Sequence, residues 1–396
     1  MMMSTRPEGL HRGDPAYRRA SLAMLAAGLA TFATLYATQA LLPIFTDDLH
    51  ISPATAALTV SAATGALALC IVPVSILSER AGRGPVLIGS ALAATLIGLA
   101  LPFAPDAHWL IALRLLQGVA VAGVPAVAMT WLAEELHEND LGQAMGLYVA
   151  GTTVGGLLGR LVPAGLLELT TWRPALFVIS AAALVGAVAM ALLLPRQRRF
   201  EPKHISLASE FRAVVAHWSN PHLAGLFVIA FVGMGVFVSV YNFVGFRMID
   251  TFGLSPGLVG LVFVMYLSGT WSSARAGALA ERFGRGRIML TGATLMLAGL
   301  CAIAAPSLWL ALPGLLVFTA SFFAMHSTAS GWIGVIATRD RAEASSMYLL
   351  CYYLGSSVLG ALAGLVFAAT SWPGFIAVAA GVLLVAVAIA AALNRS

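Results

Sequence analysis

Long apolar runs alternate with short polar connections along almost the whole chain. Each run holds about 20 residues or more, the length that an α-helix needs to cross the hydrocarbon core of a bilayer. The runs lie at residues 20–45, 54–77, 85–105, 109–133, 142–166, 173–195, 222–246, 256–278, 286–305, 308–336, 344–369 and 373–393. The pattern therefore predicts an all-α integral membrane protein with twelve transmembrane helices.

One connection is longer than the others and divides the chain into two halves. Six runs occupy 20–195 and six occupy 222–393, with 196–221 as a linker. The linker contains an amphipathic stretch at 206–217, and its basic residues are Arg196, Arg198, Arg199, Lys203 and Arg212. Such a segment either lies on the inner membrane face or acts as a solvated tether. Residues 1–19 and 394–396 are predicted to be cytoplasmic tails, the first without apolar content that would pack.

Composition supports the membrane class. Hydrophobic residues make up 60% of the chain and charged residues 10%, against about 45–50% and about 25% in soluble domains. The lipid bilayer is the expected surrounding, so the net charge of +5 does not indicate a nucleic-acid partner. Of the 22 Lys and Arg residues, Arg173 and Arg247 lie on the side opposite the N-terminus, and Arg114, Arg160 and Arg275 lie within spans. The positive-inside rule therefore predicts that both termini are cytoplasmic.

A short charged segment occurs twice, about half the chain apart. The first copy, residues 75–84, reads Ser-Ile-Leu-Ser-Glu-Arg-Ala-Gly-Arg-Gly, and the second, 277–286, reads Gly-Ala-Leu-Ala-Glu-Arg-Phe-Gly-Arg-Gly. The positions of interest are Glu79, Arg80, Gly82, Arg83, Gly277, Glu281, Arg282, Gly284 and Arg285. The repetition indicates an internal duplication, which in membrane proteins is typical of transporters built from two parallel repeats.

Both copies resemble the motif that follows the second and eighth spans in the major facilitator superfamily. The second copy matches throughout, and the first has Ser75 where the family has glycine. The resemblance covers essentially the whole chain. It implies a monomeric transporter of two pseudo-symmetric six-helix bundles, located in the bacterial inner membrane and moving a small-molecule substrate.

The same resemblance implies a gate on the cytoplasmic side. In the superfamily, the acid of each copy faces the start of a helix in the other half, which places Glu79 near Ala344 and Glu281 near Leu141. A carboxylate in that position gains about 0.3–1 kcal/mol from the helix dipole. Breaking these contacts permits inward opening. The alternative for any one of the loop arginines is a simply solvated charge.

Glycines in the run 142–166 resemble the exporter motif Gly-Pro-x-x-Gly-Gly. The matching residues are Gly151, Gly155 and Gly156, and Thr152 stands in place of proline. Together with other segments they are similar to the arabinose-efflux-permease-like branch, which favours efflux. Small residues four apart also allow close helix approach, so packing alone explains their presence.

Three ionisable side chains inside the spans are candidates for proton coupling, because charges in a membrane are costly. They are Arg114, Arg160 and His326. Arg114 and Gln117, followed by glycine, resemble the superfamily's Arg-x-x-Gln-Gly motif, whose arginine is associated with coupling in drug:proton antiporters. Alternatively, the arginines extend to the membrane surface, and the histidine is a neutral one bonded to Ser330 or a carbonyl.

No Asp or Glu falls inside any predicted span. Many proton-coupled drug exporters keep such a carboxylate, which carries the proton and attracts cationic drugs. Without it, a preference for cations loses its usual electrostatic basis, and buried arginines would tolerate a carboxylate or phosphate on the substrate.

Polar and aromatic residues on the first, fourth, seventh and tenth spans are candidates for substrate binding, because the resemblance implies that these spans line a central cavity. The candidates are Tyr36, Gln39, Arg114, Gln117, Tyr241, Asn242, His326, Ser330 and Trp332. Each alone suits a packing role equally well. Together they predict a mostly apolar, aromatic pocket for a small amphipathic molecule.

These observations predict a proton-coupled antiporter that exports a small organic molecule, a drug or a metabolite, by alternating access. Cys70, Cys301 and Cys351 lie singly in apolar runs, and no metal-ligand spacing or nucleotide motif is present, so neither a cofactor, a metal nor catalysis is expected. Two alternatives stay open: uptake or exchange of a small organic anion, and a non-transporting sensor with a transporter fold.

Overall fold

The computed structural model describes residues 9–200 and 207–395. Within them, 12 helical segments are long and apolar enough to cross a membrane, which confirms the predicted fold class. The elements are α1 Pro15–Tyr36, η1 Gln39–Leu41, α2 Leu42–Asp48, α3 Pro53–Ala81, α4 Arg83–Ala100, η2 Leu101–Phe103, α5 Ala107–Val121, α6 Gly123–Glu135, α7 Glu138–Leu166, α8 Trp172–Leu193, α9 Leu207–Trp218, α10 Pro221–Asp250, α11 Pro256–Gly260, η3 Leu261–Met265, α12 Tyr266–Phe283, α13 Arg285–Ile303, α14 Leu308–Ile336, α15 Arg341–Ala369 and α16 Trp372–Arg395.

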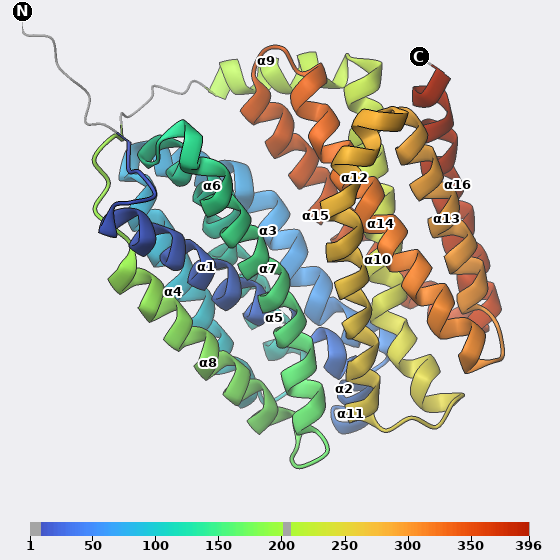
Figure 1. The fold of residues 1–396 in the computed structure, drawn as a ribbon. Coiled ribbons are helices and arrows are strands. Elements are labelled where there is room, and N and C mark those ends of the chain that lie inside the picture. The colour runs from blue at the N-terminus through green and yellow to red at the C-terminus, as the bar shows by residue number, and fades with distance from the viewer. Residues whose placement is uncertain (1–8, 201–206, 396) are drawn as a thin grey trace, which may run out of the picture.

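The helices form two bundles that stand side by side (Figure 1). The first contains α1 to α8, blue to green, and the second contains α10 to α16, yellow to red. Helix α9 lies across one end of the molecule, here called the α9 end, and α2 and α11 lie at the opposite or α2 end. Helix α1 packs extensively on α7 in the first bundle, as the corresponding α10 does on α15 in the second, and the bundles meet chiefly through α3 and α15. The two bundles thus repeat one packing scheme.

The first span is broken in its last third, toward the α2 end. Helix α1 ends at Tyr36, η1 follows, and α2 restarts at Leu42 with Pro43 in its first turn. Proline suits the first turn of a new helix because it lacks the amide hydrogen that a helix interior needs. The break was not predicted from the apolar run 20–45. It leaves the last carbonyls of α1 available to side-chain donors.

The N-terminal segment packs more than its polarity suggested. Helix α1 begins at Pro15, earlier than the predicted residue 20. Leu10 forms two backbone hydrogen bonds with residues 135–137, of 2.9 and 3.1 Å. Tyr17 is buried and donates its hydroxyl to the carbonyl of Asp140 at 2.9 Å. The prediction of a tail without packing content is therefore wrong for its described part, because one leucine and one tyrosine are enough to anchor it.

Small residues allow α1 and α7 to approach closely. A Cβ on Gly151 would lie 2.4 Å from the carbonyl oxygen of Leu25, and one on Gly155 would lie 2.4 Å from that of Leu29. The second bundle repeats this contact, because a Cβ on Gly355 of α15 would meet a carbonyl oxygen of α10 at 2.0 Å. The glycines are thus required by helix packing, whatever else they do.

We expect Gly155→Val to destabilise the protein. The added side chain must push α7 away from α1, and overpacking of this kind costs about 1–3 kcal/mol or more. Gly146→Val on the same helix is the matched control, because nothing lies within 4 Å of a Cβ at Gly146. Thermal unfolding in detergent measures the effect, and equal melting temperatures for the two variants would contradict the packing account.

The linker between the bundles is anchored at both of its described ends. The backbone amides of Arg198 and Arg199 donate to the carboxylate of Glu135 at 2.7 to 3.0 Å. On α9, the Nε2 atom of His217 lies 3.1 Å from the carbonyl oxygen of Asp340. The predicted amphipathic stretch coincides with α9, while Lys203 lies outside the described residues. The linker thus contacts both bundles.

Candidate functional site

Arg114 is enclosed in the first bundle, where it binds the end of α1. Its Nε donates to the carbonyl oxygen of Thr59 at 2.6 Å, and Nη1 donates to that of Thr34 at 3.0 Å. Nη2 donates to the carbonyl of Leu35, and Nη1 also bonds the amide oxygen of Gln117. Helix-end carbonyls lack partners within their own helix, and a cation there complements the helix dipole. Arg114 therefore joins α1, α3 and α5.

The motif that contains Arg114 works as a packing unit. One turn along α5, a Cβ on Gly118 would lie 2.1 Å from the carbonyl oxygen of Ala63, so only glycine lets α5 come this close to α3. Gln117 donates its amide to the carbonyl of Ala94 on α4 at 3.0 Å. Arg114 and Gln117 were predicted to bind substrate. To do so, these side chains would have to break hydrogen bonds that they already form within the protein.

Arg160 of α7 lies at the boundary between the bundles. Its Nε donates to the amide oxygen of Gln39 at 2.7 Å, and Nη1 donates to the carbonyl of Gly156 at 2.6 Å. The guanidinium carbon lies 4.0 Å from the ring centroid of Tyr36. Within the described residues, Nη2 has no hydrogen-bond acceptor, in contrast to every nitrogen of Arg114. The side chains of both arginines are buried in the protein, which excludes the alternative that they extend to the membrane surface.

Two aromatic residues of the second bundle complete the surroundings of Arg160. The guanidinium carbon lies 4.5 Å from the ring centroid of Tyr266 and 5.4 Å from that of Phe263. Sequence reasoning missed both, because it considered only four spans as cavity-lining, and these residues lie on the eighth. Three aromatic rings around one cation form what we call the Arg160 box, defined by Tyr36, Phe263 and Tyr266. Each cation–π contact is worth about 0.5–2 kcal/mol.

Gln39 connects the Arg160 box to the second bundle by a direct hydrogen bond. Because its amide oxygen accepts from Arg160, its amide nitrogen donates, to the side-chain oxygen of Asn242 at 2.8 Å. Asn242 then presents a buried NH₂ group that has no partner among the residues the structure describes. The hydrogen bonds from Arg160 to Gln39 and from Gln39 to Asn242 therefore cross between the bundles. In the described part of the protein, they leave two donors without partners, Nη2 of Arg160 and Nδ2 of Asn242.

Of the remaining candidate residues, Tyr241 borders the Arg160 box, because its ring centroid lies 4.8 Å from that of Tyr266 and 5.5 Å from that of Phe263. The Tyr241 hydroxyl lies 2.6 Å from the hydroxyl of Thr319, inside the second bundle. His326 of α14 is bonded through Nδ1 to the Tyr348 hydroxyl at 2.9 Å, so its partner comes from α15 and is not Ser330. Ser330 is exposed and Trp332 is half-buried, both nearer the α9 end of α14. The structure thus brings together Tyr36, Gln39, Tyr241 and Asn242 around Arg160, but not the whole predicted set.

Further contacts between the bundles lie between the middle of the molecule and the α2 end. Glu168 accepts hydrogen bonds from the hydroxyl of Ser255 at 2.5 Å and from the amide of Gly257 at 3.0 Å. The hydroxyl of Ser357 donates to the carbonyl of Ser61 at 2.7 Å. These bonds hold the bundles together at the α2 end. The sequence carried no signal for Glu168, which is one acid among several in polar connections.

Comparison with known proteins identifies the family. The Major Facilitator Superfamily model matches residues 23–274 and 226–395. The inner membrane transport protein YnfM of Escherichia coli strain K12 is 39% identical over 387 residues, covering 98% of this chain and 93% of that protein. The chain belongs to the major facilitator superfamily. It is therefore a multi-pass membrane transporter and not an enzyme.

Two other comparisons add to this assignment within the major facilitator superfamily. The multi-drug resistance efflux pump PmrA of Streptococcus pneumoniae TIGR4 is 29% identical over 199 residues, which is 48% of each chain. The crystal structure of a bacterial homologue of the human lysosomal transporter Spinster, inward-facing and occupied, has a TM-score of 0.80 at 16% identity. It covers 97% of this chain and 98% of that one. At this identity the likeness shows the fold alone.

The first copy of the superfamily's charged motif is an ion network within one bundle. Arg83 pairs with Glu79 and donates to Glu134 at 3.1 and 3.2 Å, and it also bonds the hydroxyl of Ser78 at 2.5 Å. Gln197 of the linker accepts from the backbone amides of Arg83 and the next residue. Glu79 is buried, and its second carboxylate oxygen has no partner in the described part of the chain. The network fixes the start of α4.

The second copy of the motif is arranged differently. Glu281 and Arg282 are exposed, and Arg285 is half-exposed. Among the described residues, none of the three forms an ion pair. Glu79 forms an ion pair with Arg83 of its own bundle, and Glu281 forms no ion pair among the described residues. The contacts predicted near Ala344 and Leu141 therefore stay a prediction, for a state that is closed at the α9 end.

We expect Glu79→Gln to reduce transport about two- to fivefold while the protein still folds and inserts. In a state closed at the α9 end, the free oxygen of Glu79 would accept from the helix start near Ala344. The neutral amide of glutamine lacks the charge that is attracted to a helix N-terminus. Arg83 keeps Glu134 as an ionic partner in the variant, so folding should survive. Asp106→Asn, at an exposed acid before α5 and away from the α9 end, is the control. A wild-type transport rate for Glu79→Gln would contradict the gate.

Proposed function

We propose that the protein is a proton-coupled secondary exporter of small amphipathic organic molecules that are neutral or anionic. It works by alternating access in the inner membrane, with the α9 end and both termini in the cytoplasm. The observation that carries the proposal is the position of Arg160. This buried cation lies between the bundles with one free nitrogen, within an aromatic box contributed by both halves.

The arrangement of contacts supports alternating access. The hydrogen bonds of Glu168 and Ser357 hold the bundles together at the α2 end, which the proposal assigns to the periplasmic side. Opening at that end would separate Arg160 from Phe263 and Tyr266 and would break the bond between Gln39 and Asn242. Because a bare cation is costly in a membrane, a bound substrate that satisfies Arg160 would lower the cost of this step. Substrate binding and opening would then be coupled.

Charge distribution supports a neutral or anionic substrate. In the described spans the carboxylates lie within about one turn of a helix end, so no acid is available in the middle of the membrane to attract a cation. The free nitrogens on Arg160 and Asn242 are both donors, and a ligand oxygen is what they lack. A carboxylate or phosphate would form a charge-assisted bond with the guanidinium. The three aromatic rings suit the apolar part of the ligand.

Proton coupling is assigned to His326 in this proposal. It is the one histidine deep within a span among the described residues, and imidazole is the side chain that exchanges protons near neutral pH. Its contact with the Tyr348 hydroxyl couples α14 to α15, a helix that contacts α3 of the other bundle. The similarity of half the chain to the efflux pump PmrA supports export over uptake.

Uptake or exchange of a small organic anion is the second candidate, and the absence of a mid-membrane carboxylate in the described spans favours it. Inverted membrane vesicles with an imposed proton gradient, followed with a quenched dye, distinguish the two. Matched cationic, neutral and anionic amphipaths are added in turn. An exporter collapses the gradient with neutral or anionic members in an Arg160-dependent way. Dissipation by cationic members alone would refute the proposal, and anion counterflow without proton movement would favour exchange.

A further inference from the structure

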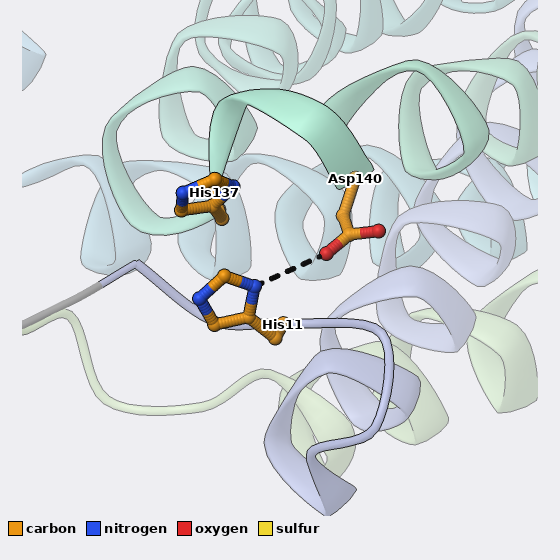
Figure 2. Close-up of side chains that lie close together, drawn as sticks. All are labelled: His11, His137 and Asp140. Carbon is orange, nitrogen blue, oxygen red and sulfur yellow. Dashed lines mark ion pairs between the residues drawn. The ribbon is translucent and has the colours of Figure 1, made fainter.

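Two histidines and one aspartate meet at the surface of the first bundle, far from the Arg160 box. His11 comes from the segment before α1, His137 from the connection between α6 and α7, and Asp140 from the first turn of α7 (Figure 2). One ligand atom from each lies within 4.8 Å of the other two. Among the described residues this is the one such group. It belongs to neither the transport site nor the charged motifs.

The geometry points to a binding site for a divalent transition-metal ion, of which zinc is the representative. We propose that His11, His137 and Asp140 supply three ligands and that water supplies a fourth. Imidazole and carboxylate are ordinary zinc ligands at about 2.0–2.2 Å, which places ligand atoms about 3.3–3.6 Å apart in a tetrahedron. The Nδ1 of His11 already lies 3.4 Å from a carboxylate oxygen of Asp140. That separation matches a shared metal and exceeds a good hydrogen bond.

Among the described residues, the two imidazole rings have no other strong partners that would prevent coordination. Their centroids lie 4.2 Å apart with an interplanar angle of 32°, so the two rings face the same small region beside Asp140. The Nδ1 of His137 accepts a long bond of 3.3 Å from the amide of Asn139, which leaves Nε2 for a metal. The side chain of His11 is 45% exposed, so solvent can deliver the ion.

The backbone that carries these ligands is held in place without a metal. Leu10 bonds to residues 135–137 on both sides of its peptide unit, and the Tyr17 hydroxyl donates to the carbonyl of Asp140. The amide of Arg12 donates to the Asp140 carboxylate at 3.2 Å, and its side chain forms an ion pair there at 3.6 Å. The site is thus preorganised, and the arginine is the cation that a metal must outcompete.

Metal binding would fasten the N-terminal segment to the start of α7. That helix carries Arg160, and its close packing on α1 depends on Gly155. A metal at this site would therefore restrain the α9 end of the α1–α7 pair. The inference is independent of the proposed substrate, since it concerns only this surface.

Isothermal titration of zinc into the full-length protein tests the site. The protein is purified in detergent, freed of any histidine tag and stripped with a chelator. Wild type should bind one zinc ion with a dissociation constant in the micromolar range or below. His11→Ala and His137→Ala should each weaken binding at least tenfold, and their double variant should lose it. His108→Ala is the control, because His108 is 98% exposed in its side chain and lies at the other end of the bundle.

A second readout separates a specific site from surface adsorption. Zinc should slow tryptic cleavage after Arg12 in wild type, and it should have no effect in the double variant. Thermal unfolding without zinc checks that each variant is folded. The proposal is overturned if wild type binds no zinc, or if the double variant matches wild type in stoichiometry and protection.

Discussion

Arg160→Ala is expected to abolish transport in a protein that still folds and inserts. The substitution removes the bond to Gln39 and the contacts with Tyr36 and Tyr266, and it takes away the free donor that the account assigns to the substrate. Losing one partner of a buried charge-assisted pair costs about 2–5 kcal/mol, which corresponds to a loss of roughly 30-fold or more. Substrate-dependent dye dequenching in inverted vesicles measures the rate, and size-exclusion chromatography confirms folding.

Two further variants make the test of Arg160 specific. Arg160→Lys keeps the charge but loses the planar fork, so it should recover little transport. Arg275→Ala is the matched control, because Arg275 is an exposed arginine of α12 stacked on Trp271 at 4.3 Å. It should transport at the wild-type rate. Transport by Arg160→Ala within threefold of wild type would show that the boundary cation is not part of the mechanism.

Arg114→Ala is expected to have a different and equally large effect, the loss of folded protein. The substitution leaves the carbonyl of Leu35 and the amide oxygen of Gln117 without the donor that Arg114 supplies, in a region that water does not reach. It also takes a second donor from the carbonyls of Thr59 and Thr34, which keep backbone partners. Each buried polar group left unsatisfied costs about 1–3 kcal/mol, so the sum is a large part of the stability of a membrane bundle. Fluorescence-detected size-exclusion chromatography and thermal unfolding in detergent measure it.

The contrast between the two arginines is the informative result. Arg114→Lys restores one donor and should recover part of the folded yield, without full thermal stability. If Arg114→Ala instead folds with the wild-type melting temperature and fails only in transport, then Arg114 takes part directly in coupling. The structural role derived from its four bonds would then be incomplete.

The apolar pattern was sufficient for the architecture because bilayer thickness sets the length of each span. It was sufficient also for the duplication, since the two charged copies at Glu79 and Glu281 stand out against apolar surroundings. For the glycines at 151 and 155, the packing alternative is confirmed, because four-residue spacing on one helix face has a direct geometric meaning. Their predicted part in gating stays a prediction. These inferences depend only on local sequence.

Contacts that join distant segments were not predictable in the same way. The motif placed Gln117 one turn from Arg114, but the oxygens that Arg114 binds come from the broken end of α1, and the run 20–45 hid that break. The neighbours of Arg160 across the boundary, Phe263 and Tyr266, lie about a hundred residues away on a span thought to line no cavity. Which face of a span meets the other bundle depends on tertiary packing, which hydropathy does not encode.

The metal-site residues illustrate the same limit. His11 and His137 lie far apart along the sequence, with most of the first bundle's helices between them. Their spacing along the chain therefore did not indicate a metal site. The short backbone pairing of Leu10 with the connection before α7 brings them together. This leucine lies in the N-terminal segment that was predicted to be polar and unpacked.

Arg160 is proposed to anchor an oxygen of the substrate between the bundles. Thermal unfolding of the purified protein with matched cationic, neutral and anionic amphipaths tests this anchoring, because it measures binding without assuming a coupling ion. We expect anionic members to raise the melting temperature most and cationic members least, and the rise to vanish in Arg160→Ala. Stabilisation by cationic members that persists in Arg160→Ala would contradict it.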